Sequence, residues 1–333
     1  MDGTALTLPD SEANRSVYSY APGQKPGCGF PQMHLLGLFD LRSGAWLRVI
    51  KSAARRHDSA LAWKLIGFLR SGDTLVADRA FCSYAFIAEL RARGVHVVMR
   101  LHQRREANMR HGKRLGKADR LQTWIKPVQA SKAMNAARHA ALPETLQVRL
   151  IATQVAVRGH QPEAMFLATT LSDPKTHSAA TIAALYLRRW EVELFFDDIK
   201  TSQNMDMLRC QSPDMLAREL LMHMIAHNLV RMLMVQADKR RAPGAIGRLS
   251  FKGTLDRINQ WHGTLWGCTS AKQADGRYEQ LLQLIAKDAV PQRLHRSEPR
   301  VVKRRHDSYP LMNKPRSEMR RLPAPPKHKK SAA

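Results

Sequence analysis

Strand-like and helix-like stretches alternate between residues 33 and 101, and this alternation limits the folds that the chain can adopt. The stretches are, in order, two strands in 33–51, a helix in 58–70, a strand in 74–78, a helix in 83–94 and a strand in 95–101. Arg42-Ser43-Gly44 provides a turn between the first two strands, Asp58 is a plausible N-cap, and Gly94 ends the second helix. This order predicts a layered α/β domain.

Beyond residue 102 the pattern changes twice. Residues 103–141 are rich in Arg, Lys and His, and strand-like alternation returns at 146–159 and 163–171. We therefore predict a strand-rich, basic segment over 103–170. Helical spacing dominates from 178 to about 238 and predicts two long helices divided near Gln211-Ser212-Pro213. The final basic, Pro-rich residues are expected to form a flexible arm.

The stretch YLRRWEVELFFDDIK (186–200) places charged groups along one side of a predicted helix. At about 100° per residue, Tyr186, Arg189, Glu193 and Lys200 share one narrow stripe. Beside it lie apolar residues that are expected to face the core, namely Leu185, Val192, Phe196 and Ile199. Exposed ion pairs are the ordinary explanation for such a stripe. A carboxylate among cations also suits a metal-bound phosphodiester, because the acid binds the metal while Arg and Lys hold phosphate oxygens.

Other acids could complete a two-metal site, which needs carboxylates from several elements. Asp78 ends a predicted strand, where an α/β sheet places its sites, although turn formation is the local alternative. Asp2 lies in MDGTALTLPDSEAN, where it is locally explained as a polar chain start. Asp40 fits a turn role better, and Asp197 lies near enough to Glu193 on the helical wheel to remain a candidate.

The net charge of +26 points to a polyanionic partner. Nucleic acid fits through phosphate contacts, and a basic surface kept for solubility is the alternative. The four cysteines form no pair with metal-binding spacing, and the chain shows no secretory signal and no apolar run of the ~18 residues that span a membrane. We expect a cytosolic protein. The absence of GxxxxGK[ST], GxGxxG and GxSxG disfavours ATPases, dehydrogenases and α/β-hydrolases.

The spacing Tyr-x2-Arg-x3-Glu-x6-Lys, formed by Tyr186, Arg189, Glu193 and Lys200, resembles the signature of bacterial insertion-sequence transposases of the IS-four type, in the DDE group. DGTALTLPDSEAN and LVADRAF resemble the two aspartate motifs of that family. Three further segments are also similar to family segments, namely 227–234, 248–261 and 309–316. The resemblance therefore covers nearly the whole chain.

The resemblance implies a catalytic triad of Asp2, Asp78 and Glu193, which would bind two Mg²⁺ ions, with Mn²⁺ as a substitute. The residues implied in DNA contact are Arg79, Trp124, Tyr186, Arg189 and Lys200. Trp124 would stack on a base swung out of the duplex, and burial in the core is the alternative for this residue. The implied partners are transposon ends and target DNA, both double-stranded, and a second copy in a synaptic homodimer, in the bacterial cytoplasm near the nucleoid and without a membrane.

The implied fold is ribonuclease H-like, with a mixed five-stranded sheet flanked by helices and a strand-rich insertion before the last catalytic helix. The expected parts are the first part of the catalytic core (1–102), the basic insertion (103–170), the helical second part of the core (171–240), a C-terminal helical region (241–295) and a basic tail (296–333). Asp2 directly follows Met1, whereas in the family a helical DNA-binding domain precedes the first aspartate. We therefore expect an N-terminally truncated chain, with backbone groups left open in the middle of the sheet.

Three functions remain open at this stage. The first is a transposase that cleaves transposon ends and transfers the strands into target DNA. The second is a catalytically inactive DNA-binding remnant, and the third is a ribonuclease H-like nuclease without strand transfer. The sequence leaves the terminal repeats and the target preference undetermined.

Overall fold

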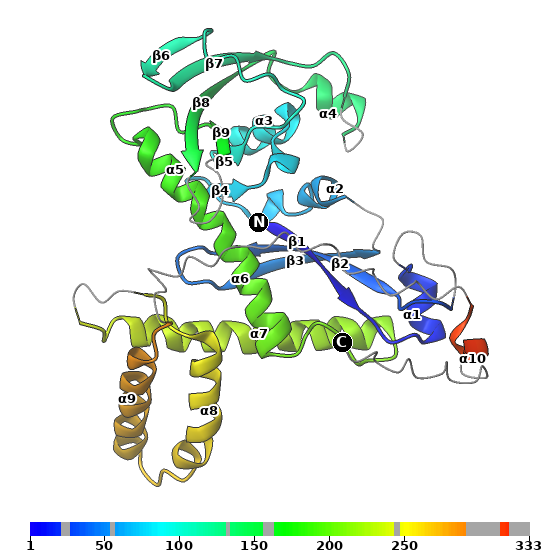
Figure 1. Ribbon diagram of the computed structural model, residues 1–333, viewed down its shortest axis with the longest axis vertical. Helices are drawn as coiled ribbons and strands as arrows, with labels where there is room; N and C mark the ends of the chain where they lie inside the picture. The colour runs from blue at the N-terminus through cyan, green and yellow to red at the C-terminus, as the bar shows by residue number, and fades with distance from the viewer. Residues whose placement is uncertain are drawn as a thin grey trace, which may run out of the picture.

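Two β-sheets lie one above the other in the computed structural model, and a run of helices passes beside both of them (Figure 1). The structure describes residues 1–20, 27–53, 57–130, 134–155, 163–242, 247–290 and 314–319. Within these residues the upper sheet has six strands and the lower sheet has three. Below the sheets lies α7 (Pro213–Asp238), and a hairpin of α8 (Phe251–Trp266) and α9 (Ala271–Lys287) projects from it. The architecture is mixed α/β.

The lower sheet contains β1 (Asp2–Thr7), β2 (Gln32–Phe39) and β3 (Trp46–Ala53), with the antiparallel β2 in the middle. Asp2, the first residue of β1, pairs with Gly37 of β2. The turn between β2 and β3 lies where the sequence predicts it, and Gly44 takes a φ of +74° there. Asp40 stabilises this turn by accepting a hydrogen bond from the Ser43 amide at 3.0 Å. The turn role expected for Asp40 is therefore confirmed.

The upper sheet follows the strand order β4-β5-β9-β8-β7-β6. Its strands are β4 (Thr74–Ala77), β5 (His96–Arg100), β6 (Lys113–Gly116), β7 (Asp119–Ile125), β8 (Thr145–Val155) and β9 (Glu163–Thr169). The pair β4 and β5, connected through α3 (Tyr84–Ala92), is parallel, and the other neighbouring pairs are antiparallel. The strands of the segment 103–170 therefore extend the sheet that begins with β4 and β5, and they do not form a sheet of their own.

The expected single five-stranded sheet is divided in the structure. Where β1 approaches β4, the Met1 amino group donates a hydrogen bond to the Val76 carbonyl at 3.1 Å. No ladder joins these two strands within the described residues. One hydrogen bond does not make a ladder, so the strands separate into sheets of three and six.

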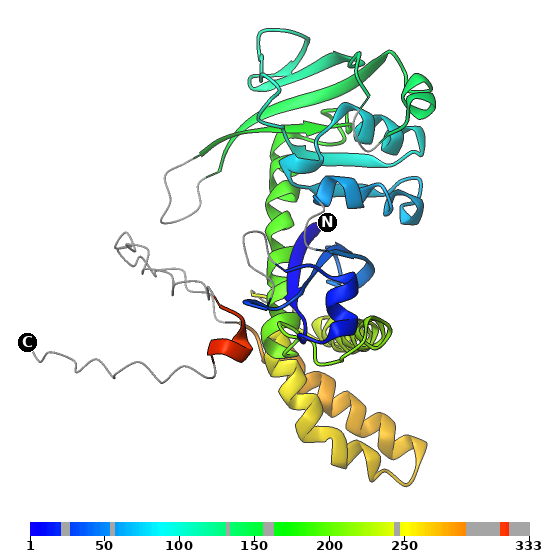
Figure 2. The same cartoon turned by 90° about the vertical axis from the view of Figure 1, so that its right-hand side faces the viewer.

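The helical run beside the sheets changes its winding along its length. It consists of α5 (Ala179–Leu187), the 3-10 turn η3 (Arg188–Trp190), α6 (Glu191–Asp197) and the π-helical turn η4 (Asp198–Ser202). Figure 2 shows α5 and α6 as one upright column beside both sheets. Val192, Phe196 and Ile199 are buried, as the helical wheel predicts. The predicted division near 211–213 is where α7 begins, with Ser212 as its N-cap.

The helix expected over 58–70 is shorter than predicted. It is divided into α2 (Asp58–Ala62) and the 3-10 turn η1 (Ile66–Phe68), and His57 occupies the N-cap position. The carboxylate of Asp58 contacts the His34 ring on β2, so it is not available to cap the helix. The prediction of Asp58 as an N-cap was wrong because this tertiary contact competes for the same oxygens.

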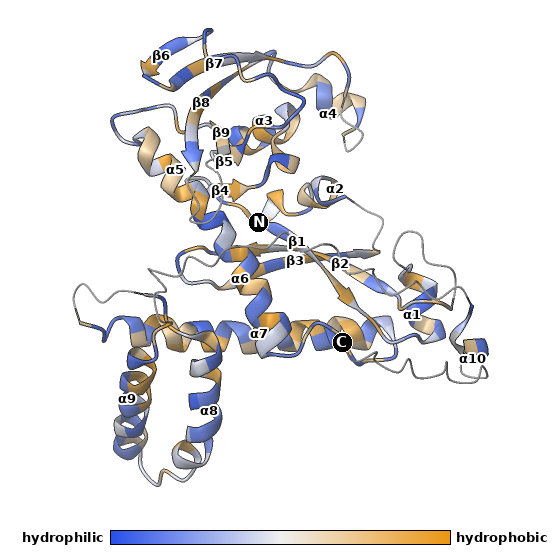
Figure 3. Ribbon diagram, viewed as in Figure 1, coloured by the Kyte–Doolittle hydropathy of each residue, from blue (hydrophilic) through white to orange (hydrophobic). Residues whose placement is uncertain are grey.

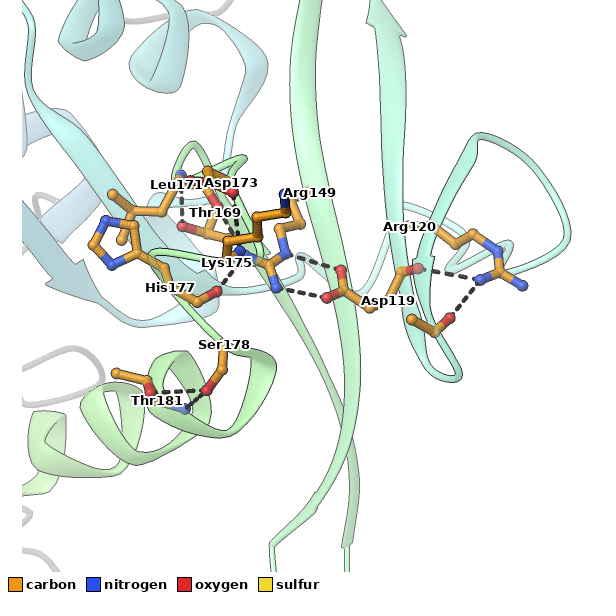
Figure 4. Close-up of polar contacts among 11 residues, drawn as sticks. Asp119, Arg120, Arg149, Thr169, Leu171, Asp173, Lys175, His177, Ser178 and Thr181 are labelled. Carbon is orange, nitrogen blue, oxygen red and sulfur yellow. Dashed lines mark hydrogen bonds and ion pairs between the residues drawn. The ribbon is translucent and has the colours of Figure 1, made fainter.

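A buried ion pair attaches the upper sheet to the start of α5 (Figure 4). The Arg149 guanidinium on β8 donates to both oxygens of Asp119 on β7, at 2.9 and 2.5 Å. The same guanidinium donates to the carbonyls of Leu171 and His177, at 3.1 and 2.7 Å. His177 directly precedes Ser178, the N-cap of α5. This network therefore fixes the start of the helical run relative to the sheet.

Apolar side chains fill the spaces between the layers. Leu35, Phe39 and Trp46 of the lower sheet pack against Phe196 of α6 and Leu220 of α7. Figure 3 shows apolar positions concentrated on the strands and along α5. None of the described helices is long and apolar enough to cross a membrane. Most of the predicted tail at 296–333 lies outside the described residues, which here include only 314–319 with the short helix α10 (Arg316–Met319).

Candidate active site

Three acids from separate elements lie around the point where the two sheets meet. Asp2 is the first residue of β1, Asp78 follows the last residue of β4, and Glu193 lies in the first turn of α6. The hydrogen bond between Met1 and Val76 places the start of β1 against β4, two residues before Asp78. The three acids are far apart along the chain, and the packing of β1, β4 and α6 brings the elements that carry them to the same region.

Arg189 joins two of these acids directly. Its Nη1 donates to Asp2 Oδ2, and its Nη2 donates to Glu193 Oε1, both at 2.9 Å. The Arg189 side chain is only 11% exposed, whereas that of Glu193 is 56% exposed. Charge-assisted hydrogen bonds of this kind are stronger than neutral ones. One guanidinium thus contacts two carboxylates that come from β1 and α6 and offsets part of their charge.

The chain start next to Asp2 is buried. Burial raises the pKa of Asp2 and the Glu193 charge raises it further, against the opposing hydrogen bond from Gly3 and the charge of Arg189. Burial also lowers the pKa of the Met1 amino group to about 5. Both shifts have the same cause, since a low-dielectric surrounding disfavours the charged form of each group.

Tyr186 connects this pair of acids electrostatically with Asp78. Its side chain is 2% exposed, and burial raises the pKa of its hydroxyl, with the Asp78 charge adding to the rise and Arg189 and Arg100 opposing it. Asp78 itself accepts a hydrogen bond from the Arg79 amide at 2.6 Å and caps η2 (Arg79–Phe81). Asp78 therefore has a local turn role, and its charge also contributes to the raised pKa of the Tyr186 hydroxyl.

The other residues singled out from the sequence lie at different distances from this group. Arg79 is exposed on η2, next to Asp78. Lys200 lies on the π-helical turn, where burial lowers its pKa and the nearby Asp206 opposes that shift. Within the described residues, no ion pair joins Lys200 to Asp2 or Glu193. The helical run changes to π winding over Asp198–Ser202, so Lys200 lies beyond the regular turns of α6 that carry Glu193.

Trp124 occupies the core, which is the alternative that the sequence left open for it. Its side chain is 4% exposed and belongs to the apolar cluster around the upper sheet. The Arg105 guanidinium lies 3.9 Å from the centre of its ring and covers one face. In this arrangement the indole has no open face on which a base could stack.

The sequence analysis did not anticipate a cavity next to Asp78. It has a volume of about 860 Å³ and is lined by residues that include Trp63, Phe81, His102 and Arg105. Residues 102–105 read His-Gln-Arg-Arg directly after a buried strand. That basic run at the end of β5 was the available signal for this cavity.

The three acids are chemically suited to a divalent metal. Carboxylate oxygens are the ligands that Mg²⁺ prefers, and the carboxylates of Asp2 and Glu193 lie close enough together to bond the same guanidinium. Arg189 contacts both of them in this structure. Across the described parts of the chain, no three His, Cys, Asp or Glu side chains are grouped so that they could hold an ion. The donor types fit Mg²⁺, and the three carboxylates would have to come closer together, with Arg189 releasing two of them, before they could hold an ion.

Comparison with known proteins identifies the family. Residues 1–229 match the family described as the transposase DDE domain. The chain belongs to this family of DDE transposases. The match spans the elements that carry Asp2, Asp78 and Glu193. The resemblance inferred from the signature spacing is therefore confirmed at the level of the family.

This DDE transposase is similar to two known proteins. It is 24% identical over 320 residues to "Transposase InsG for insertion sequence element IS4" from Escherichia coli (strain K12). The aligned residues cover 94% of this chain and 69% of that protein. It also resembles the piggyBac transposase in a cryo-EM structure of a synaptic complex with hairpin DNA, with a TM-score of 0.46 and 10% identity. That likeness covers 89% of this chain, which spans 58% of the piggyBac chain.

Proposed function

We propose that this DDE transposase cleaves phosphodiester bonds at the ends of an insertion sequence and joins the released ends to target DNA. One observation carries the proposal. Arg189 hydrogen-bonds to both Asp2 and Glu193, which come from elements far apart in the chain. Two of the three acids implied by the family signature thus lie beside each other, which supports a site for phosphoryl transfer with metal ions.

In this proposal Asp2, Asp78 and Glu193 hold two Mg²⁺ ions, which Mn²⁺ can replace. Such ions would supply Lewis-acid stabilisation of the phosphate and a more acidic water. The protein supplies the position of the three carboxylates, which are set by the first residue of β1, the end of β4 and the first turn of α6. Each carboxylate belongs to a different secondary-structure element, so the rigid scaffold fixes their spacing.

The cationic and phenolic groups of the signature would orient the DNA. A phosphate offers the planar guanidinium of Arg189 the same bidentate acceptor geometry that the two carboxylates offer now. The Tyr186 hydroxyl faces the same group and would donate to a phosphate oxygen. Arg79 and Lys200 would contact the backbone further from the reacting phosphate, since neither is joined to the acid pair. We retain no base-stacking role for Trp124.

The strand arrangement supports a ribonuclease H-like core. In that fold the first strand lies between the second and the fourth. Here β1 pairs with β2 on one side and approaches β4 on the other, through the hydrogen bond from Met1 to Val76. The parallel pair β4 and β5 continues the order outward. The divided sheet thus keeps the neighbour relations that the fold requires around Asp2.

Double-stranded DNA is the partner that the charge favours. A net charge of +26 gives a strong, non-specific attraction for phosphates. We propose that transposon ends and target DNA both bind, and that two copies of the chain act together because two ends must be cut. A position near the bacterial nucleoid would follow from that affinity.

The test is a cutting and joining assay with Mg²⁺ on DNA that carries the genomic sequences flanking the coding region. Joined product supports the proposal, binding without cutting indicates an inactive remnant, and cutting without joining indicates a nuclease. Glu193→Gln should abolish cleavage and keep DNA binding, because the scaffold is unchanged while a charged ligand is lost. The matched control is Glu191→Gln in the same turn, whose carboxylate pairs with Arg188 and does not face Asp2. Cleavage retained by Glu193→Gln would refute the site.

A further inference from the structure

The helix α7 is apolar on two opposite faces. Its inner face is buried against the sheet and the neighbouring helices, through residues such as Leu216, Leu220 and Val230. The opposite side, which we call the outward face of α7, has six large apolar side chains that are 46% to 62% exposed, namely Met215, Leu221, Met222, Ile225, Leu229 and Met232. A helix that is apolar all round is normally covered on both sides. An exposed apolar surface of this extent marks a contact surface.

The pattern on this face fits another helix better than it fits DNA. Met215, Met222 and Leu229 recur at intervals of seven residues, as do Ile225 and Met232, which is the spacing of paired helices. Between the ends of the helix, Arg218 is the charged residue that is exposed on this face. In a chain of net charge +26, a face so poor in cations is not adapted to phosphates.

The two ends of the face carry opposite charges. Asp214 lies at the N-terminal end of α7 and Lys239 at its C-terminal cap, and both are exposed. At about 100° per residue, both side chains lie on the same side as Ile225. Neither takes part in an ion pair within the residues that the structure describes. The face thus carries an acid at one end and a base at the other, and between them it is apolar except for Arg218.

We propose that the outward face of α7 binds the same face of a second copy, with the two helices antiparallel about a two-fold axis. In that register Asp214 of one copy meets Lys239 of the other, and Ile225 lies opposite Leu229. The two-fold axis makes each contact twice. A parallel pair would instead place Asp214 beside Asp214 and Lys239 beside Lys239, so the charges favour the antiparallel arrangement. Antiparallel helix dipoles favour it as well.

The interface deepens the proposed function, which requires two copies to act on two ends. Its test is nevertheless independent of that function, because association is measured without DNA or metal. A dimer that does not cleave DNA would count against the proposed function alone. A monomeric wild type that cleaves and joins DNA would count against the interface alone.

The first experiment measures the molar mass of the full chain by sedimentation at micromolar concentration. Wild type should be a dimer, and Ile225→Glu should be a monomer because it places two carboxylates close to the two-fold axis. The matched control is Val128→Glu, since Val128 is 97% exposed and lies away from α7, and it should remain a dimer. A monomeric wild type, or an Ile225→Glu variant that associates like wild type, would overturn the proposal.

A charge exchange tests the orientation of the two helices. Asp214→Lys alone and Lys239→Asp alone should each raise the dissociation constant about tenfold, because each creates two like-charged pairs across the axis. The double variant restores opposite charges and should return the dissociation constant close to the wild-type value. A double variant as weak as either single one would overturn the antiparallel arrangement. Both positions are exposed, so circular dichroism should show the fold unchanged.

Discussion

Arg189 illustrates how one residue can hold a site together before its ligands arrive. Its guanidinium is almost buried and contacts two carboxylates, while its Nε finds no hydrogen-bond partner in the described part of the chain. A buried donor without a partner carries a free-energy cost. The contact with Asp2 and Glu193 offsets that cost, and a phosphate would offer the same pairing. We infer that binding of DNA draws Arg189 away from the acids.

Replacing Arg189 should separate metal binding from DNA binding. Arg189→Gln should tighten Mn²⁺ binding in the absence of DNA by about tenfold, since a competing cation next to the carboxylates is removed. The affinity for DNA should fall in the same variant. Calorimetric titration with Mn²⁺ and fluorescence anisotropy with duplex DNA measure the two effects. Arg188→Gln, which removes a neighbouring pair with Glu191, should change neither strongly. Unchanged Mn²⁺ affinity in Arg189→Gln would contradict this role.

His227 should make the stability of the fold depend on pH. Its Nε2 lies 2.9 Å from the Gly44 carbonyl, which can only accept, so this nitrogen carries the proton of the neutral ring. Burial lowers the pKa of His227 from 6.5 to about 4, although the bond to Gly44 opposes the shift. Between pH 6.5 and 4 the unfolded chain therefore binds a proton at His227, whereas the folded chain does not. The contribution of neutral His227 to the free energy of unfolding is fully present above pH 6.5 and is lost as the pH falls from 6.5 to 4.

The expected loss from His227 is roughly 3 kcal/mol over that window, at about 1.4 kcal/mol for each unit of pKa. Urea unfolding at several pH values measures it. In His227→Gln, which cannot take up a proton, the fall between pH 6.5 and 4 should be smaller by that amount. Other groups also titrate below pH 5, so the comparison is between the two slopes. Equal slopes would show that His227 is not the source.

At the scale of elements, the contacts of Arg149 explain why the strand-rich segment belongs to the same body as the helices. Asp119 and Arg149 lie on neighbouring strands, and Arg149 also reaches the carbonyls just before α5. The Arg149 side chain is 0% exposed and that of Asp119 is 6% exposed. Every donor contact of this guanidinium therefore lies in a dry surrounding, where the loss of one partner is costly.

Breaking this ion pair should destabilise the chain far more than replacing both partners. Arg149→Met should lower the free energy of unfolding by about 3–5 kcal/mol, because it leaves the Asp119 carboxylate buried without a counter-charge. Asp119→Leu combined with Arg149→Met should recover much of that loss. Thermal and urea unfolding give both values. The control is Arg120→Met, because Arg120 directly follows Asp119 and is only partly buried. This variant should lower the free energy of unfolding only slightly. A double variant worse than the single one would argue against this account.

At the scale of the whole molecule, the excess of positive charge governs how the protein meets DNA. There are 54 Lys and Arg residues against 28 Asp and Glu residues. Binding to phosphates releases condensed counterions, so affinity depends on salt whatever the sequence of the duplex. Binding through the outward face of α7 should depend less on salt concentration, because this face has few charged residues. DNA binding and self-association should therefore respond differently to salt.

The affinity for duplex DNA should fall by on the order of a thousandfold between 50 and 200 mM salt, if six or more phosphates are contacted. Fluorescence anisotropy over a salt series measures the slope. Lys200→Gln should lower the magnitude of the slope by about one, as expected for the loss of one phosphate contact. Association through α7 should weaken far less over the same range. A DNA affinity that is independent of salt would exclude phosphate binding as the main attraction.

Much of the local structure could be predicted from the sequence because it is encoded within short windows. The hairpin of β2 and β3, the parallel pair β4 and β5 with its helix, and the start of α7 follow from turn residues, apolar runs and caps. The signature spacing also identified the family, since residue types at fixed intervals are a property of the chain itself. The predicted roles of Asp2, Asp78 and Glu193 stay predictions, which the assays above would test.

Only the tertiary structure decided the contacts between distant segments. The contact between Asp58 and His34 changed the cap of α2, and the single bond between Met1 and Val76 left two sheets where one was expected. The helical run from α5 to η4 changes its winding at η3 and η4, where the periodicity predicts one uniform helix. The physical reason is common to all three. Periodicity reports what a residue's neighbours in the chain favour, whereas hydrogen bonds and burial depend on which distant groups arrive at the same place.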